Sequence, residues 1–157
     1  MAISLTHLAL HVRDLDACIA FYRRYTGLRI VHQRISRGKR IVWLAETEKI
    51  RGASDRELDP DSERVPAGLD FILVLLPGGP GRDQLECDFS HLGFALPSEA
   101  AVDAIAEQAR TEGILAWEPK REKYPVGYYC GIRDPDGNFV EFSYGQPLGP
   151  GAPGHSD

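Results

Sequence analysis

The sequence has few cysteines and no long hydrophobic run. Cys18, Cys87 and Cys130 are widely spaced and odd in number, and no CxxC pair occurs. A disulfide framework uses more cysteines in even number, so this pattern favours a reducing compartment and predicts a cytoplasmic protein. The longest apolar runs, such as FILVLL, fall far below the roughly 20 residues that cross a bilayer, so no membrane partner is expected.

A strong excess of one charge is also lacking. The 157 residues carry a formal net charge of −5 at pH 7, which gives no indication of nucleic-acid binding. Hydrophobic residues make up 43% of the chain, enough for one folded domain with a substantial core. We therefore expect a globular protein without a nucleic-acid partner.

The pattern of apolar residues, turns and helix caps predicts one strand, one helix and three strands, twice over. The predicted elements are residues 3–12, 16–27, 28–35, 40–46 and 69–79, followed by 88–96, 98–113, 114–120, 127–133 and 138–145. Asp14 or Asp16 is expected to cap the first helix and Ser98 the second. A charged segment at 46–68 predicts a long surface loop, and the Pro/Gly-rich residues 147–157 predict a disordered tail.

The two halves of the chain resemble each other. HLALHV, beginning at His7, matches HLGFAL, beginning at His91, and the strand beginning at Phe71 matches the strand beginning at Phe139. The first half is longer, and its extra residues fit inside the loop at 46–68. The repeat predicts a single α+β domain, residues 1–146, made of two βαβββ modules at about 3–79 and 87–146.

This alignment places Leu73 of the first module opposite Glu141 of the second. Glu141 stands in an apolar strand, where an ionised carboxylate is costly unless it is solvated, paired or bound to a metal. Alternation puts it on one face with Phe139 and Ser143, and both faces of the strand are partly apolar. The strand pattern alone leaves open a half-exposed glutamate with no function.

The segments HLALHVRDLDACIAFYRRYTGL, FSHLGFAL and RDPDGNFVEF resemble the vicinal oxygen chelate superfamily of glyoxalase I, extradiol dioxygenases, fosfomycin-resistance thiol transferases and bleomycin-binding proteins. The resemblance covers about residues 3–146. It implies paired modules that curl into a cup around a divalent metal, with His7, His91 and Glu141 as ligands. It also implies a homodimer, because relatives of this length usually pair subunits to complete the cup, with the metal held within one chain or across the dimer.

The implied ligand set suits chelation of a small molecule. Two imidazoles and one carboxylate leave coordination positions open, so that paired oxygens of a substrate can bind the metal. A single strand histidine is more often structural, but two at equivalent repeat positions, together with Glu141, favour ligation. Fe(II), Mn(II), Zn(II), Ni(II) and Co(II) remain open as the metal, and His11, on the same strand face as His7, is expected to line the substrate pocket.

Two departures from the family patterns bear on the reaction. Glyoxalase I and the epimerases use a further ligand at the position assigned to Leu73, a pocket position where leucine can neither ligate a metal nor move a proton. Dioxygenases and fosfomycin transferases match the two-histidine, one-glutamate set but usually place a tyrosine where this chain has Gly131. Tyr129 lies two residues away on the same face and is the predicted catalytic substitute.

The sequence thus predicts a metal-dependent enzyme that acts on a small oxygenated substrate, with dioxygenase- or transferase-like chemistry. A glyoxalase I-like lyase and a small-molecule-sequestering protein of the bleomycin-resistance type remain as alternatives. The substrate itself cannot be named from the sequence.

Overall fold

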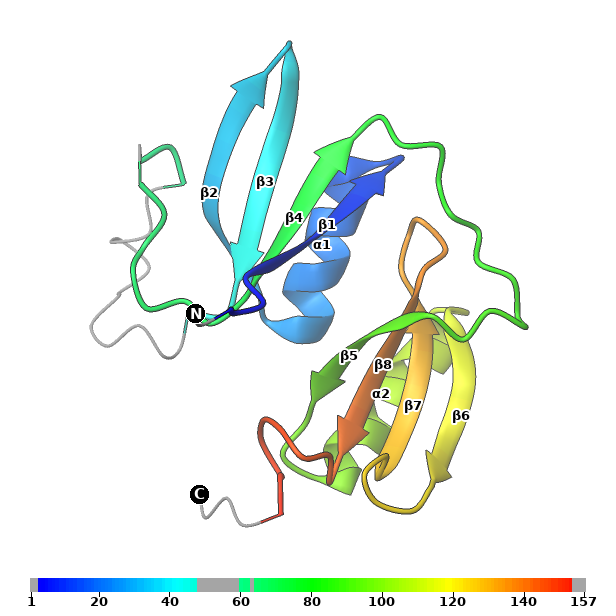
Figure 1. Ribbon diagram of the computed structural model, residues 1–157. Coiled ribbons are helices and arrows are strands. Elements are labelled where there is room, and N and C mark those ends of the chain that lie inside the picture. The colour runs from blue at the N-terminus through cyan, green and yellow to red at the C-terminus, as the bar shows by residue number, and fades with distance from the viewer. Residues whose placement is uncertain (1–2, 48–59, 63, 154–157) are drawn as a thin grey trace. The chain divides into compact units, whose positions relative to one another are not determined.

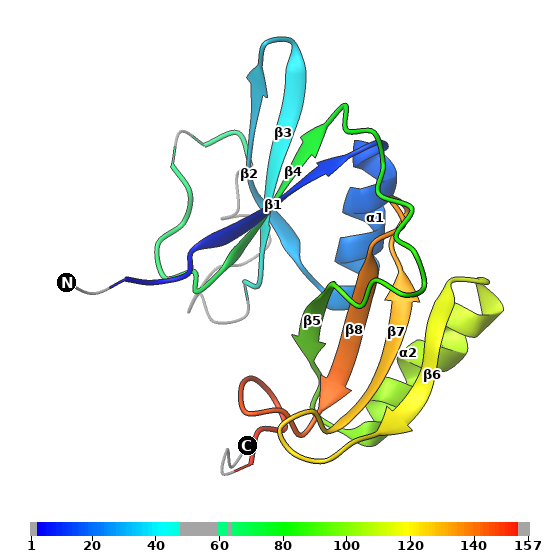
Figure 2. The same ribbon diagram turned by 45° about the vertical axis from the view of Figure 1, so that its right-hand side comes forward.

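The computed structural model of the chain describes residues 3–47, 60–62 and 64–153 (Figures 1 and 2). It divides into two compact units, residues 1–81 and 82–157, and each is described by itself. Neither helix in the described part of the chain is long and apolar enough to cross a membrane. Most of the loop predicted at 46–68 lies outside the described residues.

The first unit is a four-stranded sheet with one helix. Its elements are β1 (His7–Val12), α1 (Leu15–Thr26), β2 (Arg29–Ser36), β3 (Lys39–Ala45) and β4 (Ile72–Pro77). The strand order is β1-β4-β3-β2, and only the β1–β4 pair is parallel. Of the two predicted caps, Asp14 is the N-cap: its side chain accepts from the backbone N–H of Ala17 at 3.0 Å. Gly27 ends α1 in the left-handed conformation that glycine adopts without strain.

The second unit repeats this arrangement. Its elements are β5 (His91–Ala95), α2 (Glu99–Thr111), β6 (Leu115–Arg121), β7 (Tyr128–Arg133) and β8 (Phe139–Tyr144). The strand order is β5-β8-β7-β6, with β5 and β8 parallel. Ser98 caps α2 as predicted, accepting from Ala101 N–H at 3.2 Å. The predicted α+β architecture of two βαβββ modules is confirmed.

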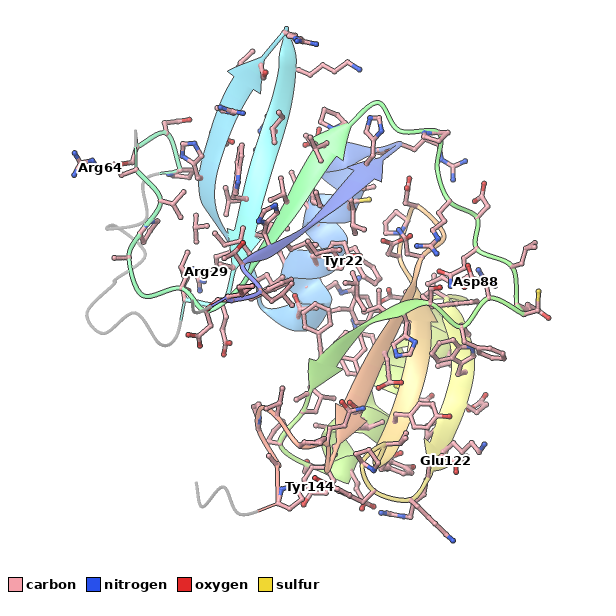
Figure 3. All side chains as sticks on the ribbon, viewed as in Figure 1. Tyr22, Arg29, Arg64, Asp88, Glu122 and Tyr144 are labelled. Atoms are coloured by element: carbon pink, nitrogen blue, oxygen red, sulfur yellow. The ribbon has the colours of Figure 1, made fainter. Side chains whose placement is uncertain are left out.

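Each helix packs on one face of its own sheet (Figure 1). Alternate strand residues facing the helix form the core, together with one stripe of the helix. In the first unit the fully buried core includes Tyr22, labelled in Figure 3, and in the second it includes Phe142. The other sheet face carries both apolar and polar side chains, Val74 in the first unit and Phe139 and Glu141 in the second.

Strand register corrects the sequence alignment of the two modules. His7 pairs with Ile72, and His91 pairs with Phe139, so Ile72 and Phe139 are equivalent. The counterpart of Glu141 is therefore Val74, and the predicted pairing of Leu73 with Glu141 was wrong by one residue. The apolar run across positions 71–76 gave no marker to fix that register.

Leu73 instead corresponds to Val140, and both are at most 2% exposed. In the second unit, this face is the one that α2 covers, because Cys130 shares it and contacts the carbonyl of Val102 on α2. Leu73 is therefore a core residue on the helix side of its sheet. The reason for placing it in a substrate pocket no longer holds.

The structure follows the predicted tail as far as residue 153, as a series of turns in which Ala152 is 4% exposed. Residues 154–157 lie outside the described residues. Disorder of the tail stays a prediction.

Candidate metal site and substrate pocket

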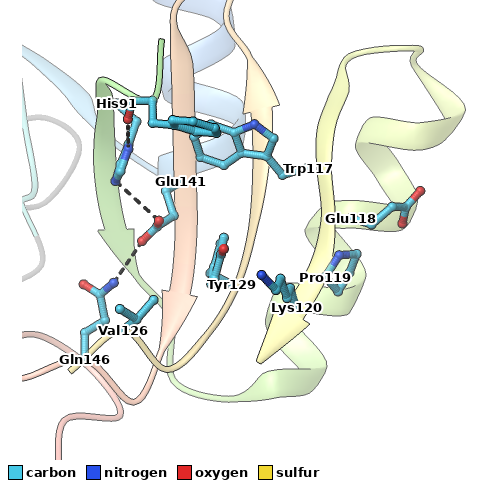
Figure 4. A pocket seen from close by; sticks show the side chains of 10 residues that line it. His91, Trp117, Glu118, Pro119, Lys120, Val126, Tyr129, Glu141 and Gln146 are labelled. Carbon is cyan, nitrogen blue, oxygen red and sulfur yellow. Dashed lines mark hydrogen bonds and ion pairs between the residues drawn. The ribbon is translucent and has the colours of Figure 1, made fainter. Parts of the chain in front are cut away.

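Glu141 lies on the face of its sheet that α2 leaves uncovered. It is 5% exposed and borders a cavity of about 680 Å³ formed within the second unit (Figure 4). The cavity is lined by Phe89, His91, Trp117, Glu118, Pro119, Lys120, Val126, Tyr129, Glu141 and Gln146. The structure thus answers why a carboxylate stands in this strand: it faces a pocket.

His91 is the nearest ionisable partner of that carboxylate. Its Nε2 lies 3.3 Å from Oε2 of Glu141, and its Nδ1 lies 2.6 Å from the carbonyl oxygen of Phe89. A carbonyl can only accept, so Nδ1 carries the proton in this hydrogen bond. In the neutral imidazole, Nε2 therefore presents a lone pair to the carboxylate.

The second carboxylate oxygen of Glu141 is held separately. Gln146 donates from Nε2 to Oε1 at 2.9 Å (Figure 4). One oxygen is therefore fixed by an amide, and the other is directed at His91. Such outer hydrogen bonds are what orient the ligands of metal sites.

The donor pair has a geometry that suits a divalent metal. With metal–ligand distances of about 2.1 Å, two donor atoms 3.3 Å apart subtend about 100° at the metal, between octahedral and tetrahedral angles. A cation at that point also removes the conflict between two facing acceptors; the alternative is a second proton on His91. Within the described ranges, no group of three or more His, Cys, Asp or Glu side chains is assembled that could hold a metal.

The other two predicted histidines belong to the first unit. His7 is exposed on β1, and its Nδ1 lies 2.9 Å from the Thr6 hydroxyl, which leaves Nε2 as the outward nitrogen. His11, also exposed, shares this strand face two pleats further on. Ligation by His7 and a pocket role for His11 both stay predictions.

Trp117 is a pocket residue that the sequence analysis missed. Its ring meets the His91 ring edge to face at 5.6 Å and lies 4.8 Å from the ring of Phe139. It occupies the space above Gly131, where a Cβ would come within 2.2 Å of the indole. A glycine in the middle of a predicted strand is the signal that could have indicated this close approach.

Tyr129 lines the pocket on the same face of β7 as Gly131, which pairs with Glu141. Its strand partner on the other side is Lys120. The hydrogen-bonded carboxylate of Glu122 raises the pKa of Lys120, with a smaller contribution from Tyr129. The rim of the pocket thus keeps a positive charge next to the predicted catalytic hydroxyl.

Gln146 and Phe89 were also missed, because both act from outside the strands. Gln146 follows β8, and Phe89 precedes β5, contributing a backbone carbonyl that no side-chain pattern reveals. The sequence found the two candidate ligands in this unit but not the groups that orient them.

Comparison with known proteins agrees with this fold. The protein PA2024 of Pseudomonas aeruginosa, described as uncharacterized, is 53% identical over 152 residues, covering 97% of this chain and 96% of that protein. A possible glyoxalase from Bacillus cereus has 22% identity and a TM-score of 0.57, covering 90% of this chain and 99% of the other. A mutant of the fosfomycin resistance protein FosX from Listeria monocytogenes has 20% identity and a TM-score of 0.58, covering 91% of this chain and 93% of the other.

These two structures share the fold at low sequence identity. A family model matches residues 4–142, which span both modules and reach Glu141. The chain belongs to the Glyoxalase/Bleomycin resistance protein/Dioxygenase superfamily.

Proposed function

We propose that the protein is a metal-dependent enzyme in which His7, His91 and Glu141 hold a divalent ion and a small oxygenated substrate binds beside it. One observation carries the proposal: Nε2 of His91 and Oε2 of Glu141 face each other at 3.3 Å inside a pocket, with the other atom of each group already hydrogen-bonded. Two histidines and one carboxylate leave open positions for ligands.

A divalent ion at this point supplies a Lewis acid that holds and polarises paired oxygens of the substrate. Fe(II), Mn(II), Zn(II), Ni(II) and Co(II) all accept nitrogen and oxygen ligands of this kind. The Listeria FosX structure contains Mn(II) and 1S,2S-dihydroxypropylphosphonic acid, a molecule with hydroxyls on adjacent carbons. That precedent supports a substrate with neighbouring oxygens.

The protein's own residues orient the donors and shape the pocket. Gln146 and the Phe89 carbonyl fix the Glu141 carboxylate and the His91 ring, and Trp117 forms an apolar wall against the His91 ring. Tyr129 lines the same pocket, which supports a role for its hydroxyl in donating or accepting a proton at a substrate oxygen.

The register of the two modules favours dioxygenase- or transferase-like chemistry over glyoxalase-type isomerisation. Isomerisation needs a base beside the metal in addition to the ligands. At the position equivalent to Glu141, the first module has Val74, which offers neither a ligand nor a base.

The metal content of the purified protein tests the proposal directly. Protein purified without chelators should retain close to one divalent ion per site by inductively coupled plasma mass spectrometry, and Glu141→Ala should retain none. Glu118→Gln is the matched control, because Glu118 borders the same pocket but is paired with Arg110 at 2.6 Å and is largely exposed.

The control should keep the metal content of the parent. Equal metal retention by Glu141→Ala and the parent would remove Glu141 as a ligand. A parent that binds no added ion but binds small molecules would favour the sequestering alternative.

We also infer a homodimer. The superfamily resemblance supports it, as do apolar side chains left exposed in the first unit, with Ile3 86%, Leu5 79% and Phe71 40% exposed. Sedimentation equilibrium at micromolar concentration should give twice the chain mass; a compact monomer would contradict the inference.

A further inference from the structure

Gln84 is a buried polar residue that lies outside the pocket and outside every predicted site. It is 4% exposed and lies in the segment that leads into β5. Burial of an amide is costly unless its hydrogen bonds are made, so the partners of Gln84 indicate what it holds in place.

Both donors of the Gln84 amide are used on one short turn. Its Nε2 donates to the carbonyl of Asp88 at 2.7 Å and also to the carbonyl of Ser90. These two carbonyls flank Phe89, whose own carbonyl receives the Nδ1 proton of His91. Gln84 therefore holds the peptide groups on both sides of the one that fixes the His91 ring.

The oxygen of the same amide is used on β8. Oε1 accepts from the backbone N–H of Phe139 at 3.2 Å, and Phe139 is the register partner of His91. The opposite orientation of the amide would put donors against Phe139 N–H and an acceptor against two carbonyls, so only this orientation satisfies all partners. Gln84 thus ties the start of β5 to the start of β8.

Glu141 lies two residues along β8 from Phe139, on the same face. Fixing Phe139 against the turn before His91 therefore fixes the separation of the two candidate ligands. The backbone of Gln84 is tied to the β7–β8 connection as well, with its N–H donating to Gly137 at 3.0 Å and its carbonyl accepting from Arg133 at 2.9 Å.

We infer that Gln84 is a positioning residue for the metal site: by holding the turn at 88–90, it aims the Phe89 carbonyl at Nδ1 of His91 and so directs Nε2 of His91 at Glu141. This inference rests on the proposed function in assigning His91 to a metal. Its effect on the imidazole is independent of any metal.

The test uses Gln84→Met, which keeps the side-chain length but removes all three hydrogen bonds. Imidazole tautomers are read from two-bond ¹H–¹⁵N spectra of metal-free, histidine-labelled protein at pH 8, with His91 assigned by its loss in His91→Asn. The parent should show Nδ1 of His91 protonated, whatever the state of Nε2, and Gln84→Met should show Nδ1 partly unprotonated, because the Phe89 carbonyl that accepts its proton is no longer held in place. The affinity for Mn(II), measured by calorimetric titration, should fall about tenfold or more, as for other outer-shell changes.

Gln33→Met is the matched control. Gln33 also anchors a loop, donating to Asp61 at 2.8 Å and accepting from Arg40 at 2.9 Å, but it lies in the first unit. A loss of stability common to both variants but a tautomer shift confined to Gln84→Met separates positioning from general stabilisation.

The outcomes distinguish this inference from the proposed function. An unchanged His91 tautomer in folded Gln84→Met overturns the inference, even where the parent binds Mn(II). A shifted tautomer supports it, even where the parent binds no metal and the proposed function fails.

If Gln84→Met does not fold, Asp88→Ala provides the second variant, because the exposed Asp88 carboxylate orders the same turn through the N–H and hydroxyl of Ser90 at 2.9 and 2.6 Å. It should shift the His91 tautomer in the same direction and by less. A folded Asp88→Ala with the parent spectrum overturns the inference.

Discussion

The two units share one topology and differ most on the sheet face that the helix leaves uncovered. In the first unit, Val74 lies between Ala9 of β1 and Trp43 of β3, and at the equivalent place in the second unit, Glu141 lies between Gly93 and Gly131. The helix-covered faces are alike in their central strand, where Leu73 and Leu75 of β4 and Val140 and Phe142 of β8 are at most 2% exposed. The two modules share the scaffold, but only the second has a carboxylate at this position.

The two units also carry their tryptophan on different strands. The first unit has Trp43 on its third strand, 5.0 Å from His32 on the neighbouring strand. The second unit has Gly131 at the position of Trp43 and Trp117 at the position of His32. An indole on the outer strand that leans over a glycine leaves Glu141 open to the pocket, which an indole directly opposite it would obstruct.

The largest loss of stability is expected when a charge is placed on the helix-covered face of the first unit's sheet. Leu73→Glu places a carboxylate at a position 2% exposed, against the helix, with no designed partner. We expect a loss of about 3 kcal/mol or more in unfolding free energy, because an unpaired buried charge is among the most destabilising changes. Urea denaturation followed by circular dichroism measures it.

Val74→Glu is the matched variant, at the next residue and on the opposite face. It places the carboxylate at the repeat position of Glu141, where Val74 is 6% exposed, so this variant should also lose stability. The loss should be smaller than for Leu73→Glu, because the helix does not cover this face and His7 lies on it. Equal losses in the two variants would contradict the register of the modules.

The register between the two modules was not predicted correctly from the sequence. The module order, the helix caps at Asp14 and Ser98, and the candidate ligand pair of His91 and Glu141 all follow from periodicity, capping chemistry and resemblance. Leu73 was misassigned because an uninterrupted apolar strand reads the same when shifted by one residue.

The orienting groups were missed for a different reason. The Phe89 carbonyl and the partners of the Gln84 amide are backbone groups, which leave no pattern in the side chains, and one of those partners, Phe139, is distant in sequence. Their roles depend on folded geometry, which local propensity does not determine.

An intermediate loss of stability is expected when a side chain is added at Gly131, which lies under the indole of Trp117. Gly131→Ala puts a methyl group 2.2 Å from Trp117, whose ring is backed by Phe139 and cannot move away freely. We expect a loss of about 1–3 kcal/mol, typical of overpacking. Gly93→Ala, on the other side of Glu141, has nothing within 4 Å of the added Cβ and is the control.

The clash can be assigned with a double-mutant cycle. In a Trp117→Leu background, Gly131→Ala should cost much less, since the smaller side chain leaves room for the methyl group. The same cost in both backgrounds would show that backbone conformation, rather than the indole, requires glycine there.

The smallest effect concerns one strand position on the helix-covered faces, where the second unit has a thiol and the first has valine. Cys130 in β7 corresponds to Val42 in β3, and both are 0% exposed. Burial, with smaller contributions from Asp103 and Glu141, raises the pKa of Cys130 from 9.0 to about 12. As pH rises from 9 toward 12, the unfolded chain ionises this thiol while the folded chain keeps it protonated, so the folded state loses stability across that window.

Cys130→Val gives this position the residue that the first unit has there, and should abolish this part of the alkaline slope, a difference of about 1 kcal/mol between pH 9 and pH 10. Tyr128, whose pKa is raised chiefly by its hydrogen bond to Asp103, contributes in the same direction to both proteins and cancels in the difference. Denaturant midpoints of parent and variant at pH 7, 9 and 10 measure the effect, with Cys87→Ser at an exposed cysteine as the control. If the unfolding free energies of parent and Cys130→Val fall in parallel as pH rises, the folded state accommodates the Cys130 thiolate. Burial would then not penalise ionisation of this thiol.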